Sequence, residues 1–135
     1  MENHDKKLQL SLLLLRATVF LVMFMWTIDK FINPGHAMQV FESFYSIAGL
    51  ENNVMYLIGT IEIIILLLFL IGWKKPYTYG TVLLLHTVST LSSFKQYLAP
   101  FEGPNLLFFA AWPMLSACIA LFLLRDQDRL LSVGR

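Results

Sequence analysis

Three ionisable side chains, Arg16, Glu62 and His86, stand within long apolar runs of this sequence. Ionisable groups at membrane depth are costly, so they usually face the interior of a helix bundle and pair with one another. Arginine has a planar fork that can bind a carboxylate through two hydrogen bonds, and an imidazole beside such a pair can bond to either group or titrate near neutral pH. The residue types therefore predict an Arg16–Glu62 ion pair with His86 close to it.

The positions of these residues within their runs predict a similar depth in a membrane. Each lies eight or nine residues after the start of its run, which is Leu8, Asn53 or Tyr77. At about 1.5 Å per residue, this distance is roughly 12–14 Å into a hydrocarbon core about 30 Å thick. We therefore expect one polar layer near the middle of the membrane.

Other polar side chains extend from this layer along the same predicted helix faces. His86, Thr90 and Ser93 recur at helical spacing, and Lys30 lies fourteen residues after Arg16, which is close to four turns. These faces predict a cleft that opens toward the outer side of the membrane. The predicted ligand site comprises the following residues: Arg16, Lys30, Glu62, His86, Thr90, Ser93, Lys95 and Trp112.

Each part of this site also has a purely structural interpretation. A buried Arg–Glu pair can simply fix which helices face each other. His86 can make a structural hydrogen bond, and Thr and Ser side chains can join neighbouring helices. The meeting of three ionisable residues at one depth favours a ligand site.

Several other kinds of chemistry are excluded by what the sequence lacks. It has no glycine-rich phosphate loop, no cluster of metal ligands and no Ser-His-Asp arrangement, and it encodes no cofactor site. The single cysteine, Cys118, excludes an internal disulfide and is expected to pack in an apolar run. A formal net charge of only +1 gives no basis for nucleic-acid binding.

The elements that must position the site are four apolar runs. The chain is 57% hydrophobic and 14% charged, whereas soluble domains carry about 25% charged residues. A membrane helix needs about 20 apolar residues, and four segments meet this length: 8–31, 53–73, 77–97 and 105–124. The sequence therefore predicts a single all-α domain, a four-helix transmembrane bundle, with a kink at Pro113 in the last span.

A short amphipathic helix is predicted between the first two spans. Apolar residues recur at three- and four-residue spacing over residues 37–48, from Ala37 to Ala48, and polar residues fill the other face. This pattern is typical of a helix lying at the membrane interface. It would either cap the bundle or form a lid over the predicted site.

The placement of lysines and arginines predicts the orientation. Seven of the ten fall on one side of the predicted spans: Lys6, Lys7, Lys74, Lys75, Arg125, Arg129 and Arg135. The segment 35–52 has two glutamates and no lysine or arginine. Because cytoplasmic loops are enriched in Lys and Arg, we expect both termini in the cytoplasm.

Short motifs in the first two runs resemble those of the DoxX family of small four-helix bacterial membrane proteins. The motifs are Leu15-Arg16, Asp29-Lys30-Phe31, Ile58-Gly59-Thr60-Ile61-Glu62 and Leu70-Ile71-Gly72. The features that correspond to the family are Arg16, Lys30, Phe31, Glu62 and Gly72. The resemblance implies a protein of the bacterial inner membrane.

The resemblance also implies an association with redox chemistry. Members of the family include a membrane subunit of a thiosulfate–quinone oxidoreductase, and partners of redox enzymes or of cofactor maturation. The implied function is therefore a ligand-binding subunit, for which the candidate ligand is a quinone, with a redox partner protein or a second copy of the chain as further partners. Two alternatives stay open: a small proton-coupled transporter in which Glu62 or His86 titrates, and a structural or assembly subunit without chemistry of its own.

Overall fold

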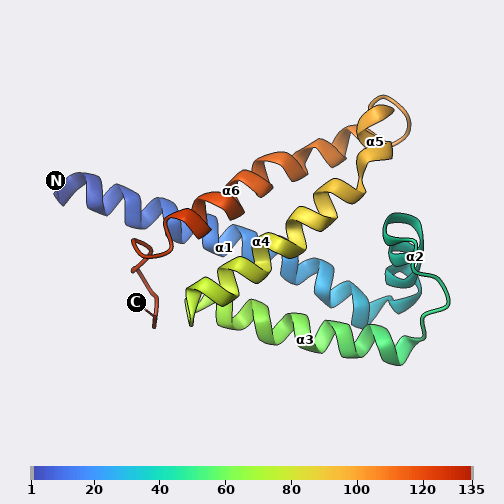
Figure 1. Cartoon of the computed structure of the whole chain (residues 1–135), viewed down its shortest axis with the longest axis horizontal. Coiled ribbons are helices and arrows are strands. Elements are labelled where there is room, and N and C mark those ends of the chain that lie inside the picture. The colour runs from blue at the N-terminus through green and yellow to red at the C-terminus, as the bar shows by residue number, and fades with distance from the viewer. Residues whose placement is uncertain (1, 135) are drawn as a thin grey trace.

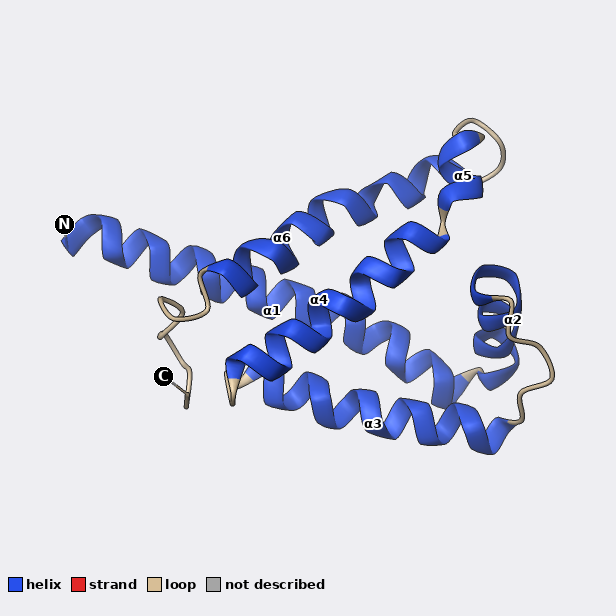
Figure 2. Ribbon diagram, in the orientation of Figure 1, coloured by secondary structure: helices blue, strands red, loops and turns tan. Residues whose placement is uncertain are grey.

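The computed structural model describes residues 2–134, and within this range it contains helices, turns and loops but no strand (Figure 2). The predicted all-α class is therefore confirmed. The elements in chain order are α1 (Glu2–Ile32), α2 (Pro34–Tyr45), α3 (Asn52–Leu70), α4 (Lys75–Ser92), α5 (Phe94–Leu98), the 3-10 helix η1 (Asn105–Ala110) and α6 (Ala111–Leu123).

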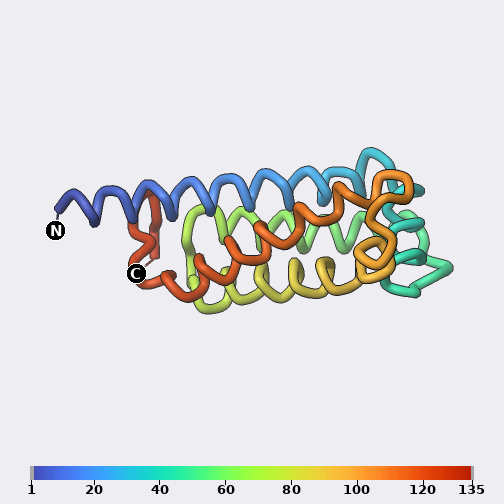
Figure 3. Tube along the Cα trace, turned by 90° about the horizontal axis from the view of Figure 1, so that it is seen from above, coloured from blue at the N-terminus to red at the C-terminus, as the bar shows by residue number. Residues whose placement is uncertain are grey.

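The long helices pack in a closed cycle. α1 packs against α3 and α6, and α4 packs against the same two helices from the other side. Helix α2 lies across one end and contacts α1, α3 and α4 (Figure 1). We call this the α2 end. The opposite end holds the start of α1, the turn between α3 and α4, and residues 124–134, and we call it the terminal end (Figures 1 and 3).

Three helical stretches are long and apolar enough to cross a membrane: Glu2–Ile32, Asn52–Leu70 and Asn105–Leu123. Many of their large apolar side chains point away from the packed interior, for example Leu14, Ile64 and Leu107. Water-soluble proteins rarely expose large contiguous apolar surfaces, whereas lipid chains cover them at no cost. The three apolar helices thus indicate a membrane protein.

The predicted span 77–97 differs from the other three. It is not one helix, because α4 ends at Ser92 and α5 begins at Phe94. α4 is also too polar to fall among the three apolar stretches. Its polar residues Thr78, His86 and Thr90 are buried, whereas Leu84 and Leu91 on its other face are exposed. The helix therefore turns its polar face toward the other helices.

The remaining predicted boundaries shift for local reasons. α3 ends three residues before Trp73, because Gly72 adopts a left-handed φ of +74° that ends the helix. The amphipathic helix predicted over residues 37–48 is present as α2, but it starts at Pro34 and ends at Tyr45, before Ser46 with φ +58°.

Close to Pro113, where a kink was predicted, the structure shows a change of helix type. Residues 105–110 form the 3-10 helix, and the α-helix starts at Ala111, so Pro113 lies in its first turn. A proline is tolerated there because the first N–H groups of an α-helix have no intrahelical acceptor.

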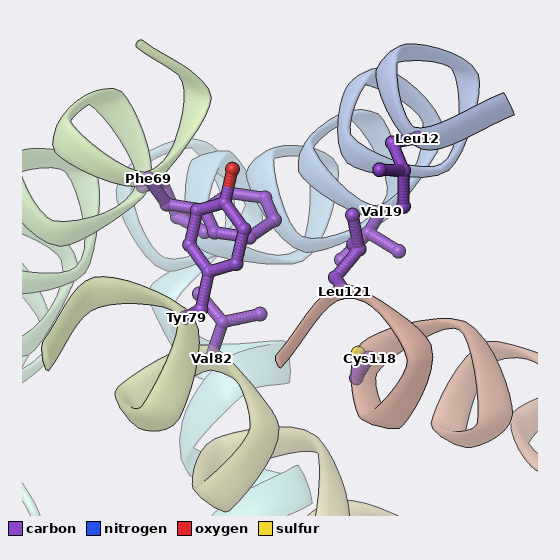
Figure 4. Close-up of a cluster of buried hydrophobic side chains, with 8 residues drawn as sticks. Leu12, Val19, Phe69, Tyr79, Val82, Cys118 and Leu121 are labelled. Atoms are coloured by element: carbon purple, nitrogen blue, oxygen red, sulfur yellow. The ribbon is translucent and has the colours of Figure 1, made fainter. Parts of the chain in front are cut away.

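The apolar core lies toward the terminal end and draws on all four long helices (Figure 4). The rings of Phe69 and Tyr79 meet at a centroid distance of 5.0 Å. Cys118 is buried in the same cluster, as expected for a packing residue. The cluster comprises Leu12, Val19, Leu66, Phe69, Tyr79, Val82, Cys118 and Leu121.

Candidate functional site

The predicted Arg16–Glu62 ion pair is wrong, because each residue has another partner. Arg16 lies beside Asp128, with 3.6 Å between Nη1 and Oδ2. Glu62 pairs with Lys30, with 3.0 Å between Oε1 and Nζ. The predicted single polar layer is therefore divided. Arg16 belongs to the terminal end, and Glu62 contacts the last turns of α1, toward the α2 end.

At the terminal end, buried polar groups form what we call the terminal cluster: Gln9, Arg16, Lys75, Tyr79 and Asp128. Arg16 and Asp128 are fully buried. The Tyr79 hydroxyl donates to Asp128 Oδ2 at 2.5 Å. The Tyr79 hydroxyl and the adjacent Arg16 compensate the charge of the buried carboxylate at Oδ2, whereas Oδ1 has no hydrogen-bond partner among residues 2–134.

The partner carboxylate comes from residues 124–134, which fold back against the helices and which we call the return segment. Arg16 Nη2 donates to the carbonyl of Leu130 at 2.5 Å and to that of Leu131 at 3.3 Å. The Gln9 side-chain oxygen accepts from the backbone N–H groups of Arg129 and Leu130 at 2.8 and 3.0 Å. The side chains of α1 thus supply the hydrogen bonds that this irregular backbone needs when it is buried.

Helix α4 and the turn before it hold the return segment from the other side. Lys75 donates to the carbonyls of Asp128 and Gly134, and the N–H of Val133 donates to the carbonyl of Ile71 at 2.9 Å. Burial lowers the pKa of the Lys75 ammonium from its usual range, and the Asp128 carboxylate opposes this shift. The terminal cluster is thus directed at the chain's own backbone, which is a structural role.

Asp128 is not among the predicted site residues, because it lies beyond the last predicted span, which ends at residue 124. No local feature singles it out from the neighbouring charged residues Arg125, Asp126 and Arg129, and the apolar pair that follows, Leu130-Leu131, is exposed.

The second polar group comprises Thr27, Lys30 and Glu62, and we call it the α2-end cluster. Lys30 Nζ lies 3.0 and 3.2 Å from the two carboxylate oxygens of Glu62. The Thr27 hydroxyl lies 3.0 Å from Glu62 Oε2. The side chains of Lys30 and Glu62 are 11% and 21% exposed, so this ion pair is open to a ligand in a way that the Arg16–Asp128 pair is not.

Local sequence explains how α1 and α3 bring this cluster together. Thr27 and Lys30 are three residues apart and therefore share a face of α1. Gly59 lies one turn before Glu62 on α3, and a Cβ atom there would come within 2.6 Å of the Phe31 ring. The absence of a side chain at Gly59 therefore lets the end of α1 lie directly on α3.

Helix α2 contributes an aromatic ring to the same region. The Phe41 ring centroid lies 6.0 Å from Lys30 Nζ, at the limit of a cation–π contact. α2 also reaches η1, where the rings of Phe44 and Phe108 stack at 5.8 Å. The helix therefore covers the α2-end cluster on one side and bridges to the segment before α6.

His86 makes contacts that join α4 to α6. Its Nε2 lies 3.0 Å from the carbonyl of Ala111, so this nitrogen must donate, and 3.2 Å from the Thr90 hydroxyl. The Thr90 hydroxyl donates to the His86 carbonyl at 2.7 Å, and the Tyr97 hydroxyl donates to the Thr90 carbonyl at 2.8 Å. The predicted polar face of this run is present, and its hydrogen bonds serve helix packing.

The other predicted site residues lie on the α4–α6 side of the molecule. Ser93 is buried at the break between α4 and α5, and Lys95 is exposed on α5. The Trp112 ring lies 5.3 Å from that of Tyr97. Among residues 2–134, none of these three side chains has a hydrogen bond or ion pair with Lys30 or Glu62. Of the predicted set, only Lys30 and Glu62 form a polar pair across α1 and α3.

Comparison of the chain with protein-family models, curated proteins and solved structures finds no match. The resemblance to the DoxX family therefore stays a prediction. The residues on which it rests divide between the two ends of the molecule. Lys30, Phe31 and Glu62 lie together at the α2 end, whereas Arg16 and Gly72 both contact the return segment.

Proposed function

We propose that this membrane protein binds the polar head of a quinone, or of a similar amphipathic molecule, at the α2-end cluster. It would act as a DoxX-like membrane subunit or partner of a redox system. The supporting observation is the partly exposed Lys30–Glu62 ion pair between α1 and α3. Ionisable groups held within apolar helices are expensive, so a pair that is left partly open is a candidate contact for a ligand.

The chemistry of the cluster matches a ligand with a carbonyl oxygen. The Lys30 ammonium carries three N–H donors, and Glu62 occupies only some of them. A ligand carbonyl beside Nζ would accept one of the others, while Glu62 keeps the ammonium charged and oriented. Phe41 offers a ring surface on the α2 side for a planar quinone ring, and the exposed apolar helices give access from the lipid.

The proposal includes four membrane crossings, with α4 and α5 as the third. α4 is held between α3 and α6, both of which belong to the apolar stretches. Its polar face is turned inward, which makes the crossing compatible with lipid. The terminal end carries Lys6, Lys7, Lys74 and Arg125, which supports a cytoplasmic location of both termini in a bacterial inner membrane.

Quinone binding to the purified protein in lipid nanodiscs tests this function. Unaltered protein is expected to bind a short-chain ubiquinone or menaquinone analogue saturably. Lys30→Met and Glu62→Gln are each expected to weaken binding by about 10- to 100-fold. Lys30→Met removes the charged hydrogen-bond donor, and Glu62→Gln removes the carboxylate that orients this donor. Equilibrium dialysis or the quenching of tryptophan fluorescence measures the affinity.

Lys95→Gln is the matched control, because it removes a cation from the exposed surface of α5 at the same end of the molecule. It is expected to bind like the unaltered protein. His86→Ala is expected to lower thermal stability and leave the affinity unchanged, because His86 bonds to Ala111 and Thr90. Absence of saturable binding by the unaltered protein, or an equal loss in Lys95→Gln, would refute the proposal.

A further inference from the structure

A groove runs along the face of α1 near the point where the chain turns into α2. Its volume is about 430 Å³, and it is open to the surroundings of the molecule. Leu21, Met25 and Trp26 on its wall are more than half exposed. The lining residues are Leu21, Val22, Met25, Trp26, Asp29 and His36.

The groove is polar at one end only. His36 Nδ1 and Asp29 Oδ2 lie 2.6 Å apart, and the His36 ring stacks on Trp26 at a centroid distance of 6.4 Å. From Asp29 toward Leu21 the wall is apolar over eight residues of helix, which is about 12 Å. One leaflet contributes half of a hydrocarbon core roughly 30 Å thick, so the apolar wall approaches the depth of one leaflet.

The direction of the groove fits a lipid. Its polar end lies where α1 meets α2, and its apolar wall leads toward the middle of α1. A phospholipid in the leaflet at the α2 end has the same direction, with its headgroup at the surface and its chains pointing inward.

The charges at the polar end select among headgroups. The Asp29 carboxylate attracts a cation and repels a purely anionic headgroup. Since Nδ1 of His36 faces Asp29, its Nε2 is the nitrogen left for a ligand. When His36 is neutral, Nε2 accepts from an ammonium, and when it is protonated, Nε2 donates to a phosphate. A headgroup with both groups is therefore matched in either state.

We propose that this groove is a binding site for a zwitterionic phospholipid with a primary ammonium headgroup. The ammonium contacts Asp29, the phosphate lies near His36, and one acyl chain lies along Leu21, Val22 and Met25. This site is on the outward face of α1 and is separate from the quinone site proposed above. The lipid proposal therefore does not depend on the quinone proposal.

Trp26 provides a direct probe, because it lines the groove. In a Trp73→Phe, Trp112→Phe background, Trp26 is the only remaining tryptophan. Its fluorescence is measured in phosphatidylcholine vesicles that contain brominated phosphatidylethanolamine, phosphatidylcholine or phosphatidylglycerol at equal mole fraction. Quenching is expected to be strongest with brominated phosphatidylethanolamine, with a relative affinity about two- to fivefold above the other two lipids, as for partly exposed ion pairs.

Asp29→Asn combined with His36→Gln is expected to remove this headgroup preference while retaining the basal quenching by acyl chains. Glu42→Gln, which removes a carboxylate from α2 outside the groove, is the control and is expected to keep the preference. Equal quenching by all three lipids would mean that the His36–Asp29 pair only holds the start of α2 against the end of α1. This result would overturn the proposal. So would stronger quenching by phosphatidylglycerol. Both refuting outcomes are measured on protein with the unaltered groove, so they do not depend on whether the groove variants fold.

Discussion

Removal of the Asp128 carboxylate tests whether the return segment is an integral part of the fold. In Asp128→Leu the fully buried Arg16 loses its only ion-pair partner among residues 2–134, and the Tyr79 hydroxyl loses its acceptor. At the observed 3.6 Å and an effective dielectric constant of about 20, the lost attraction is about 5 kcal/mol. Because Arg16 keeps its bonds to two backbone carbonyls, we expect a loss of about 3–5 kcal/mol in the free energy of unfolding.

A double-mutant cycle with Arg16→Leu separates the pair from its surroundings. Each single variant leaves one uncompensated buried charge, whereas the double variant leaves none. We therefore expect a coupling energy of about 2–3 kcal/mol, so that the double variant loses much less stability than the sum of the single losses. Reversible unfolding by sodium dodecyl sulfate in mixed micelles, followed by circular dichroism, provides the free energies.

Arg129→Gln serves as the control for this cycle, because it removes an exposed ion pair with Asp5 from the same segment. It is expected to cost less than about 1 kcal/mol. Single losses that add within about 0.5 kcal/mol, or an Asp128→Leu loss no larger than that of Arg129→Gln, would show that the return segment does not stabilise the helices through this pair.

Two further predictions concern backbone packing and pH. Gly59→Ala is expected to destabilise the protein by about 1–3 kcal/mol, because the new methyl group would meet the Phe31 ring at 2.6 Å. Gly35→Ala, with nothing within 4 Å of the added Cβ, is expected to be neutral or stabilising in the same unfolding assay, and equal effects at both positions would contradict this. Burial lowers the pKa of Lys75 in the folded state, so the unfolded state binds more protons between that pKa and the usual lysine pKa of 10.5. Stability therefore rises with pH across this range. Unfolding of the unaltered protein and of Lys75→Met, compared at increasing alkaline pH, should show this gain only in the unaltered protein, and parallel curves would contradict the assignment.

The helical elements could be predicted from the sequence because they depend on local patterns. Runs of about 20 apolar residues identify α1, α3 and the η1–α6 stretch, and three- and four-residue spacing identifies α2. The polar face of α4 was also readable, because His86, Thr90 and Ser93 recur at helical spacing and all three are buried. The residues at which the helices end were less predictable, since they depend on single residues such as Gly72 and Ser93.

The partners of the buried charges were decided by tertiary structure alone. Counting residues from the start of each run placed Arg16 and Glu62 at one depth, but α1 begins at Glu2 and Lys30 reaches Glu62 from the end of the same helix. The partner of Arg16, Asp128, is 112 positions away in the sequence and lies in a segment without helical periodicity. Local patterns carry no information about such a contact. A charge that is buried takes the carboxylate that the folded chain brings within reach, and here the return segment brings Asp128.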